Sequence, residues 1–128
     1  MVGSVLVSHS DLCARGVAEL GLMMAPAVPV RAAGGMADGG LGTDYAKIFE
    51  AIEEVQGLSD DGVAVIADMG SSFMTAEMVI EDMGGEGIAL IDCPFVEGSV
   101  AAIVSASCGA SLEEVIRTAE EAREERKH

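Results

Sequence analysis

A histidine stands at the C-terminal end of a short apolar run near the start of the chain, where it could carry chemistry. The segment Val5-Leu6-Val7-Ser8-His9-Ser10 ends in a residue suited to opening a helix. An imidazole there can be a general base, a metal ligand or a nucleophile toward phosphorus. The other histidine, His128, is expected to take no part in chemistry.

A carboxylate, Asp68, follows a second apolar run, Val63–Ala67. A carboxylate that ends a buried strand is costly without a partner. If Asp68 faces His9 across neighbouring strand ends, it can accept the N–H of one ring nitrogen and leave the other free as a nucleophile. The sequence leaves an alternative open, in which Asp68 is an ordinary turn or cap before Ser71.

Several hydroxyl side chains and glycines stand where helices are expected to begin. The hydroxyls are those of Ser10, Thr43, Ser71 and Ser72, and the glycines are Gly42 and Gly70. Capping a helix is the default role of such hydroxyls. The same geometry offers hydroxyls and backbone N–H groups to a tetrahedral oxyanion, and a phosphoryl group is such an anion. We therefore include these residues as candidates for phosphoryl binding.

Other kinds of site have weaker support. A metal site would need further ligands at fixed spacing, and only carboxylates are available. Neither the dinucleotide motif nor the P-loop motif occurs, so we predict no metal and no cofactor. A hydrolase using a serine, His9 and Asp68 stays open, although no G-x-S-x-G elbow occurs. A non-catalytic sensor that binds an anion at these helix ends is a further alternative.

The elements that must position these residues follow from hydrophobic periodicity. Strands are predicted at about 4–8, 28–33, 63–67 and 88–91. Five helices are predicted. The first ends at Met24, the second follows a cap at Thr43, and the third spans Phe73 to Met83. The fourth ends near Ser107, and the fifth follows a capping box at Ser111. Five of the nine residues in 34–42 are glycine, a composition typical of a loop.

This alternation predicts an α/β fold, with one parallel, doubly wound sheet covered by helices on both faces. In such a sheet the C-terminal ends of all strands share one edge. His9, the glycine loop, Asp68–Ser72 and Asp92–Gly98 are therefore expected to meet there. At 128 residues, the chain is predicted to be one domain, 1–128.

The charge and composition of the chain limit the classes of partner that it can bind. The chain has 22 acidic and 7 basic residues and a net charge of −15, which argues against nucleic acid and anionic membrane surfaces. Such a surface fits a basic partner protein or a salt-rich cytoplasm. Three widely spaced cysteines suggest buried, reduced thiols and no disulfide framework. The sequence shows neither a signal peptide nor an apolar run long enough to span a membrane, so we expect a soluble cytoplasmic protein.

Six segments together resemble a known family. They are Val7–Ser10, Ala32–Gly34, Gly42–Asp44, Asp68–Ser71, Pro94–Gly98 and the run from Ala101 to Gly109. The chain resembles the phosphotransfer subunit of phosphoenolpyruvate-dependent dihydroxyacetone kinase, which is similar to mannose-class enzyme IIA domains of the sugar phosphotransferase system. The likeness covers almost the whole chain. The loop 35–41 is more glycine-rich than is usual for the family.

The resemblance implies a phosphohistidine relay. His9 would accept a phosphoryl group from the phosphocarrier HPr, and Asp68 would orient the ring, with Thr43, Ser71 and Ser72 around the phosphoryl group. The group would pass to ADP on the nucleotide-binding kinase subunit, and the ATP formed would serve the dihydroxyacetone-binding subunit. The alternative acceptor is the IIB component of a mannose-class transporter.

The implied fold is a three-layer sandwich around a mostly parallel four-stranded sheet of order 2-1-3-4, usually in a homodimer. No HPr-like or enzyme I-like domain follows Arg126, so those partners are expected on separate chains.

Overall fold

Four parallel strands form one sheet in the computed structural model, which describes residues 1–128. The strand order is β2-β1-β3-β4. The strands are β1 (Gly3–Ser8), β2 (Val30–Gly34), β3 (Val63–Ala67) and β4 (Ile88–Ile91). The helices are α1 (Asp11–Met24), α2 (Tyr45–Leu58), α3 (Gly70–Asp82), α4 (Phe95–Ser107) and α5 (Leu112–Glu121), followed by a short 3-10 turn, Ala122–Glu124. The predicted fold class and strand order are confirmed.

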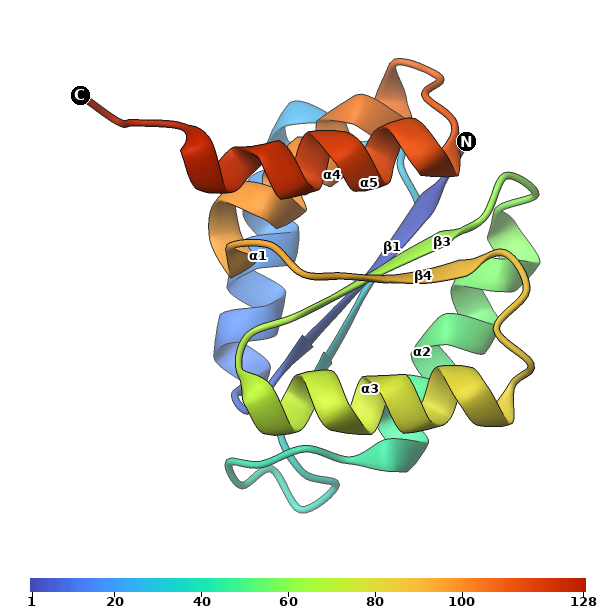
Figure 1. Cartoon of the computed structure of the whole chain (residues 1–128). Helices are drawn as coiled ribbons and strands as arrows, with labels where there is room; N and C mark the ends of the chain where they lie inside the picture. Colours follow the sequence, from blue (N-terminus) through green and yellow to red (C-terminus); the bar gives the residue numbers. More distant parts are fainter.

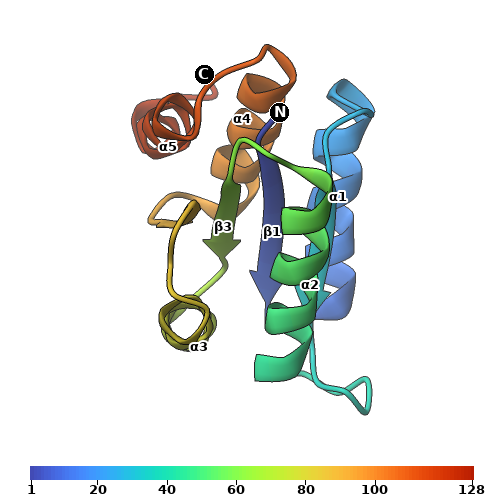
Figure 2. The same cartoon turned by 90° about the vertical axis from the view of Figure 1, so that its right-hand side faces the viewer.

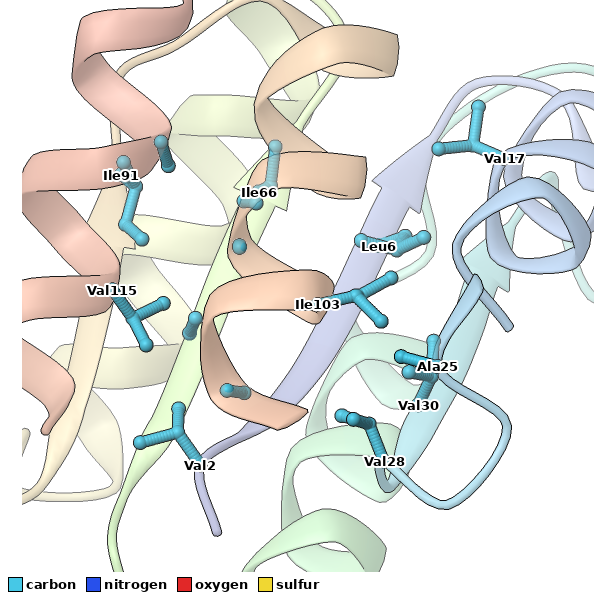
Figure 3. Close-up of a cluster of buried hydrophobic side chains, with 14 residues drawn as sticks. Val2, Leu6, Val17, Ala25, Val28, Val30, Ile66, Ile91, Ile103 and Val115 are labelled. Atoms are coloured by element: carbon cyan, nitrogen blue, oxygen red, sulfur yellow. The ribbon is translucent and has the colours of Figure 1, made fainter. Parts of the chain in front are cut away.

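Helices cover both faces of the sheet (Figures 1 and 2). Side chains of β1 alternate between the two resulting cores, because successive residues of a strand point to opposite faces. Leu6 packs with Ile103 and other residues of α1, α4 and α5 (Figure 3). Val5 packs on the other face with Ile52 and further residues of α2 and α3. Burial on both faces explains why strand residues form continuous apolar runs.

The strand predicted at about 28–33 runs from Val30 to Gly34, and two predicted helix starts are wrong. Asp44, not Thr43, caps α2, and its side chain accepts a hydrogen bond from the Lys47 N–H at 3.2 Å. Helix α3 begins at Gly70, three residues before the predicted start at Phe73. Glycine and serine are poor helix formers, so the apolar period begins later than the helix itself.

The prediction of buried thiols is wrong for two of the three cysteines. Cys13 and Cys108 are exposed, and Cys93 is half-buried. Cys13 lies next to the buried Ala14, but on the outer face of α1. No helix in the chain is both long and apolar enough to span a membrane.

Candidate functional site

The end of β1 and the end of β3 lie side by side at the C-terminal edge of the sheet. The two strands pair in register, with Val7 opposite Ala67, and the Asp68 N–H donates to the Val7 carbonyl at 3.0 Å. Helices α1 and α3 both begin at this edge (Figure 1). The parallel pairing therefore brings His9 and Asp68 together, although they are 59 positions apart in the sequence.

The contact expected between His9 and Asp68 is present. The ring Nδ1 lies 3.0 Å from Asp68 Oδ1, and the side chains are 27% and 13% exposed, respectively. The His9 N–H and the Ser8 hydroxyl donate to Asp68 Oδ2, at 3.1 and 2.9 Å. The Met69 N–H donates to Oδ1 at 2.7 Å. Asp68 is thus fixed by its neighbours, while the imidazole stays open to solvent.

These contacts keep the Asp68 carboxylate ionised. Partial burial acts to raise its pKa, because a charged group loses hydration there. Hydrogen bonds from the His9 N–H, the Ser8 hydroxyl, the His9 ring and Ser72 act in the opposite direction and prevail. The pKa of Asp68 is therefore lowered below its ordinary value.

The ionised carboxylate determines which ring nitrogen carries the proton. A carboxylate only accepts hydrogen bonds, so the Nδ1 that faces it must be the donor. In the neutral ring, Nε2 then holds the lone pair. The Ser71 hydroxyl contacts Nε2 and donates to it. The nitrogen available for nucleophilic attack thus points toward the first turn of α3.

Helix α3 presents free backbone N–H groups beside that nitrogen. No side chain caps this helix, and its first turn carries no acidic residue. The first backbone hydrogen bond of the helix is donated by Phe73 to the Met69 carbonyl at 3.0 Å. The N–H groups of Gly70, Ser71 and Ser72 are left for another acceptor. Such a helix start favours an anion.

A second hydroxyl pair lies behind the ring. Ser72 is fully buried, and its Oγ lies 3.0 Å from His9 Nδ1. Thr43 Oγ1 lies 3.2 Å from Ser72 Oγ, so Thr43 meets the imidazole only through Ser72. These hydroxyls stand on the Asp68 side of the ring, whereas Ser71 stands on the Nε2 side.

The remaining predicted residues support the strand end through local hydrogen bonds. Ser10 caps α1 by accepting from the Cys13 N–H at 3.2 Å. The Gly42 N–H donates to the His9 carbonyl at 2.8 Å. Gly42 has φ 144°, a conformation that favours glycine. Gly34 is also required, because a Cβ there would lie 2.5 Å from the Ser10 carbonyl oxygen.

The sequence analysis missed one member of the site, Ser8. Its hydroxyl is buried, donates to Asp68 and accepts from the Ser10 N–H at 3.1 Å. A buried hydroxyl needs a partner, so a serine within an apolar strand was an available signal. The signal could not identify the partner, because that depends on which strand lies alongside.

Comparison with known proteins identifies similar chains. The sequence profile of the family described as "PTS system fructose IIA component" matches residues 3–116. The chain is 40% identical over 123 residues to the "PEP-dependent dihydroxyacetone kinase, phosphoryl donor subunit DhaM" of Escherichia coli. That match covers 91% of this chain but 26% of the relative, so the chain spans about a quarter of that relative's length.

Two relatives are matched over most of their own length. One is the "PEP-dependent dihydroxyacetone kinase 1, phosphoryl donor subunit DhaM" of Listeria innocua, 37% identical over 77% of each chain. The other is the "PTS-dependent dihydroxyacetone kinase, phosphotransferase subunit DhaM" of Lactococcus lactis, 31% identical over 88% of this chain and 89% of the relative.

Solved structures share the fold. A crystal structure of a protein of unknown function matches with a TM-score of 0.81 and 29% identity, covering 94% of this chain and 93% of that one. The phosphotransferase system component EIIA of Streptococcus agalactiae matches with a TM-score of 0.71 and 12% identity, covering 97% and 93%. The second likeness concerns the fold alone.

Proposed function

Because the chain belongs to the PTS system fructose IIA component family, we propose that it is a phosphohistidine carrier. His9 is the phosphorylated residue and Asp68 is the residue that orients it. The observation that carries this proposal is the unequal surroundings of the two ring nitrogens. Nδ1 is held 3.0 Å from Asp68 Oδ1, whereas Nε2 faces the uncapped start of α3. Nε2 is therefore the nitrogen that receives the phosphoryl group.

The proposed transfer is a displacement between two nitrogens. The Nε2 lone pair attacks the phosphorus of a donor phosphohistidine, and a new N–P bond forms. The N–P bond of the donor breaks, and its electron pair returns to the donor ring. Asp68 stabilises the positive charge that develops on the His9 ring, while Nδ1 keeps its proton. Such a transfer needs little beyond alignment and charge stabilisation.

The start of α3 would hold the transferred group. Its phosphoryl oxygens would accept from the N–H groups of Gly70, Ser71 and Ser72. The Ser71 hydroxyl, which donates to Nε2 in the free protein, would turn to donate to a phosphoryl oxygen. For Ser10, Gly42 and Thr43 we propose supporting roles, because each is engaged in a contact that holds the site together.

We propose HPr as the donor and ADP on the nucleotide-binding subunit of dihydroxyacetone kinase as the acceptor. The resulting ATP would serve the dihydroxyacetone-binding subunit. The names of the Listeria innocua and Lactococcus lactis relatives support this assignment, because the chain matches most of their length. Residues 1–128 would form one such domain, in a cytoplasmic homodimer.

Radiolabelled phosphoenolpyruvate, with enzyme I and HPr, tests the proposal. The wild-type protein should gain one phosphate that is stable to alkali and labile to acid, as expected of a phosphoramidate. A His9→Gln protein should gain none, and labelling of that variant would refute the assignment. Circular dichroism should show that His9→Gln keeps its fold, so that the absence of label is not caused by unfolding.

The identity of the acceptor is tested by asking which protein removes the labelled phosphate from His9. Adding the kinase subunits with ADP should remove the phosphate from His9 and yield labelled ATP. Adding instead a mannose-class IIB component should leave the label in place. The reverse result would make the chain the IIA component of a sugar transporter.

One observation favours a second candidate, a serine hydrolase. Ser71, His9 and Asp68 form a chain of hydrogen bonds in the order of a catalytic triad. In that case Ser71 would be the nucleophile and His9 its base. Titration with a fluorophosphonate separates the two functions, because a hydrolase would be labelled at Ser71. We expect no labelling, since family membership favours the histidine as nucleophile.

A further inference from the structure

The hydroxyls of Ser72 and Thr43 lie on the Asp68 side of the His9 ring, away from the nitrogen that would carry the phosphoryl group. Ser72 Oγ lies 3.0 Å from Nδ1, and Thr43 Oγ1 lies 3.2 Å from Ser72 Oγ. Ser72 is fully buried and Thr43 is half-buried, so water does not compete for the Ser72 hydroxyl. Any part that these two hydroxyls have in the transfer therefore runs through Nδ1.

The direction of each hydrogen bond in this group follows from the ionised carboxylate of Asp68. Nδ1 donates to Asp68 Oδ1, so the Ser72 oxygen faces Nδ1 as a second acceptor of the same proton. The Ser72 hydroxyl also forms a hydrogen bond with Asp68, and Ser72 is the donor there because a carboxylate only accepts. Since the Ser72 proton is then engaged, the Thr43 hydroxyl donates to Ser72. The hydrogen bonds therefore run from Thr43 to Ser72 and from Ser72 to Asp68.

This order restrains the plane of the His9 ring. Rotation of an imidazole about its Cβ–Cγ bond is soft, so one hydrogen bond leaves the ring plane loosely defined. Two acceptors at 3.0 Å from Nδ1, one at the end of β3 and one in the first turn of α3, define that plane. Because the Thr43 hydroxyl occupies one lone pair of Ser72, the Ser72 proton is directed to Asp68 and the other lone pair to Nδ1. The direction of Nε2 depends on the same plane.

We propose that Thr43 is a positioning residue that acts on His9 through Ser72, by holding the ring in the plane that directs Nε2 at the phosphorus. This inference rests on the proposed function, because it concerns alignment in the same transfer. Thr43 follows the glycine loop, and the Gly42 N–H also donates to the His9 carbonyl at 2.8 Å. The segment between β2 and α2 thus holds the His9 backbone directly and the His9 ring through Ser72.

The test removes one hydroxyl with little change of shape, by Thr43→Val. Thr118→Val is the matched control, because Thr118 is also half-buried and its hydroxyl donates to the Glu114 carbonyl within α5, away from the site. Each protein is loaded from phosphorylated HPr at increasing concentration, which separates the rate at saturation from the HPr concentration that gives half of that rate. The Nδ1 proton of His9 is also observed by NMR in the free protein, without any donor.

Thr43→Val should lower the saturating rate about three- to tenfold, the effect of one lost hydrogen bond, and leave the half-saturating HPr concentration within about twofold of wild type. Thr43→Ser, which restores the hydroxyl, should load at nearly the wild-type rate. The Nδ1 proton signal should shift in Thr43→Val and stay unchanged in Thr118→Val. Adding Thr43→Val to Ser72→Ala should slow loading no further than Ser72→Ala alone, because residues in one hydrogen-bond chain are not additive.

Two results would refute this role of Thr43 and leave the carrier function standing. One is a wild-type loading rate in Thr43→Val. The other is a double variant in which the two losses multiply, together with an unchanged Nδ1 signal in Thr43→Val, because a hydroxyl that binds the phosphoryl group directly would behave in that way. If the wild-type protein itself takes up no phosphate, the carrier function fails and the positioning role fails with it.

Discussion

Helices α3 and α5 both have a serine at their start, but only in α5 does a side chain accept a hydrogen bond from an N–H group of the first turn. At α5 the Ser111 hydroxyl accepts from the Glu114 N–H at 3.2 Å, and Glu114 accepts from the Ser111 N–H at 3.1 Å. At α3 no side chain caps the helix, and the Ser71 hydroxyl turns to His9. The N–H groups at the α5 start are therefore satisfied within the chain, whereas those at the α3 start have no side-chain acceptor.

Charge reinforces this difference. The first turn of α5 holds Glu113 and Glu114, and the first turn of α3 holds no acidic residue. Carboxylates stabilise a helix start, so α3 gives up stability that α5 gains. The carboxylate nearest to the α3 start is that of Asp68, which accepts from the Met69 N–H and faces the His9 ring. We infer that the lack of an acidic residue within the first turn keeps the N–H groups there free for phosphoryl oxygens.

The largest effect is expected from Asp68→Asn. An amide can turn its NH₂ group toward Nδ1, which would favour the wrong tautomer and remove the charge that stabilises the developing imidazolium. Loading of His9 from HPr should fall about 100-fold or more. Asp82→Asn is the control, because Asp82 accepts a hydrogen bond from Tyr45 at the other end of α3. Equal loading rates for the two variants would remove Asp68 from the mechanism.

Ser71→Asp would give α3 the acidic first turn that α5 already has. The new carboxylate would repel phosphoryl oxygens, and loading should fall about tenfold or more, the effect of a misplaced charge beside the site. The same substitution should stabilise the folded protein by about 0.3–1 kcal/mol in urea denaturation, because an acid there favours the helix. Ser71→Ala separates the loss of the hydroxyl from the gain of charge. A Ser71→Asp protein that loads at the wild-type rate would contradict the proposed phosphoryl site.

The sequence was sufficient to predict the meeting of His9 and Asp68. Each follows an apolar run, and parallel strands end at one edge, so the pattern places both residues at that edge. That β1 and β3 lie side by side was implied by the family resemblance, through the strand order 2-1-3-4. Strands β3 and β4 also match their predicted ranges, 63–67 and 88–91. These inferences depend on hydrophobic pattern, which is strong wherever a strand is buried on both faces.

The start of α3 was not predictable in the same way. The helix begins with Gly70-Ser71-Ser72, residues of low helix propensity, and its apolar period starts only at Phe73. The choice between Thr43 and Asp44 as the cap of α2 is similarly local, because both residue types can cap. Periodicity thus predicts where elements lie, whereas caps depend on backbone geometry that periodicity does not contain.

Acid should remove the stabilisation that Asp68 and Glu114 give to the folded protein. The pKa values of Asp68 and Glu114 are both lowered in the folded protein, so each carboxylate stabilises the fold above its unfolded pKa. That stabilisation is lost as the pH falls through the folded value. The stability advantage of wild type over Asp68→Asn, measured by urea denaturation, should therefore shrink between about pH 5 and pH 2. An advantage that grew in this range would reverse the assigned direction.

The smallest effect on function is expected from Ser111→Ala, which breaks the capping box of α5. The Glu114 N–H would lose its acceptor, and the free energy of unfolding should fall by about 1 kcal/mol. The melting temperature should fall by roughly 4 °C. Loading of His9 should stay at the wild-type rate, because α5 lies in the helical layer away from the start of α3 (Figure 2). A loading defect in Ser111→Ala would mean that the two helix starts are coupled, and that the uncapped α3 start alone does not account for the site.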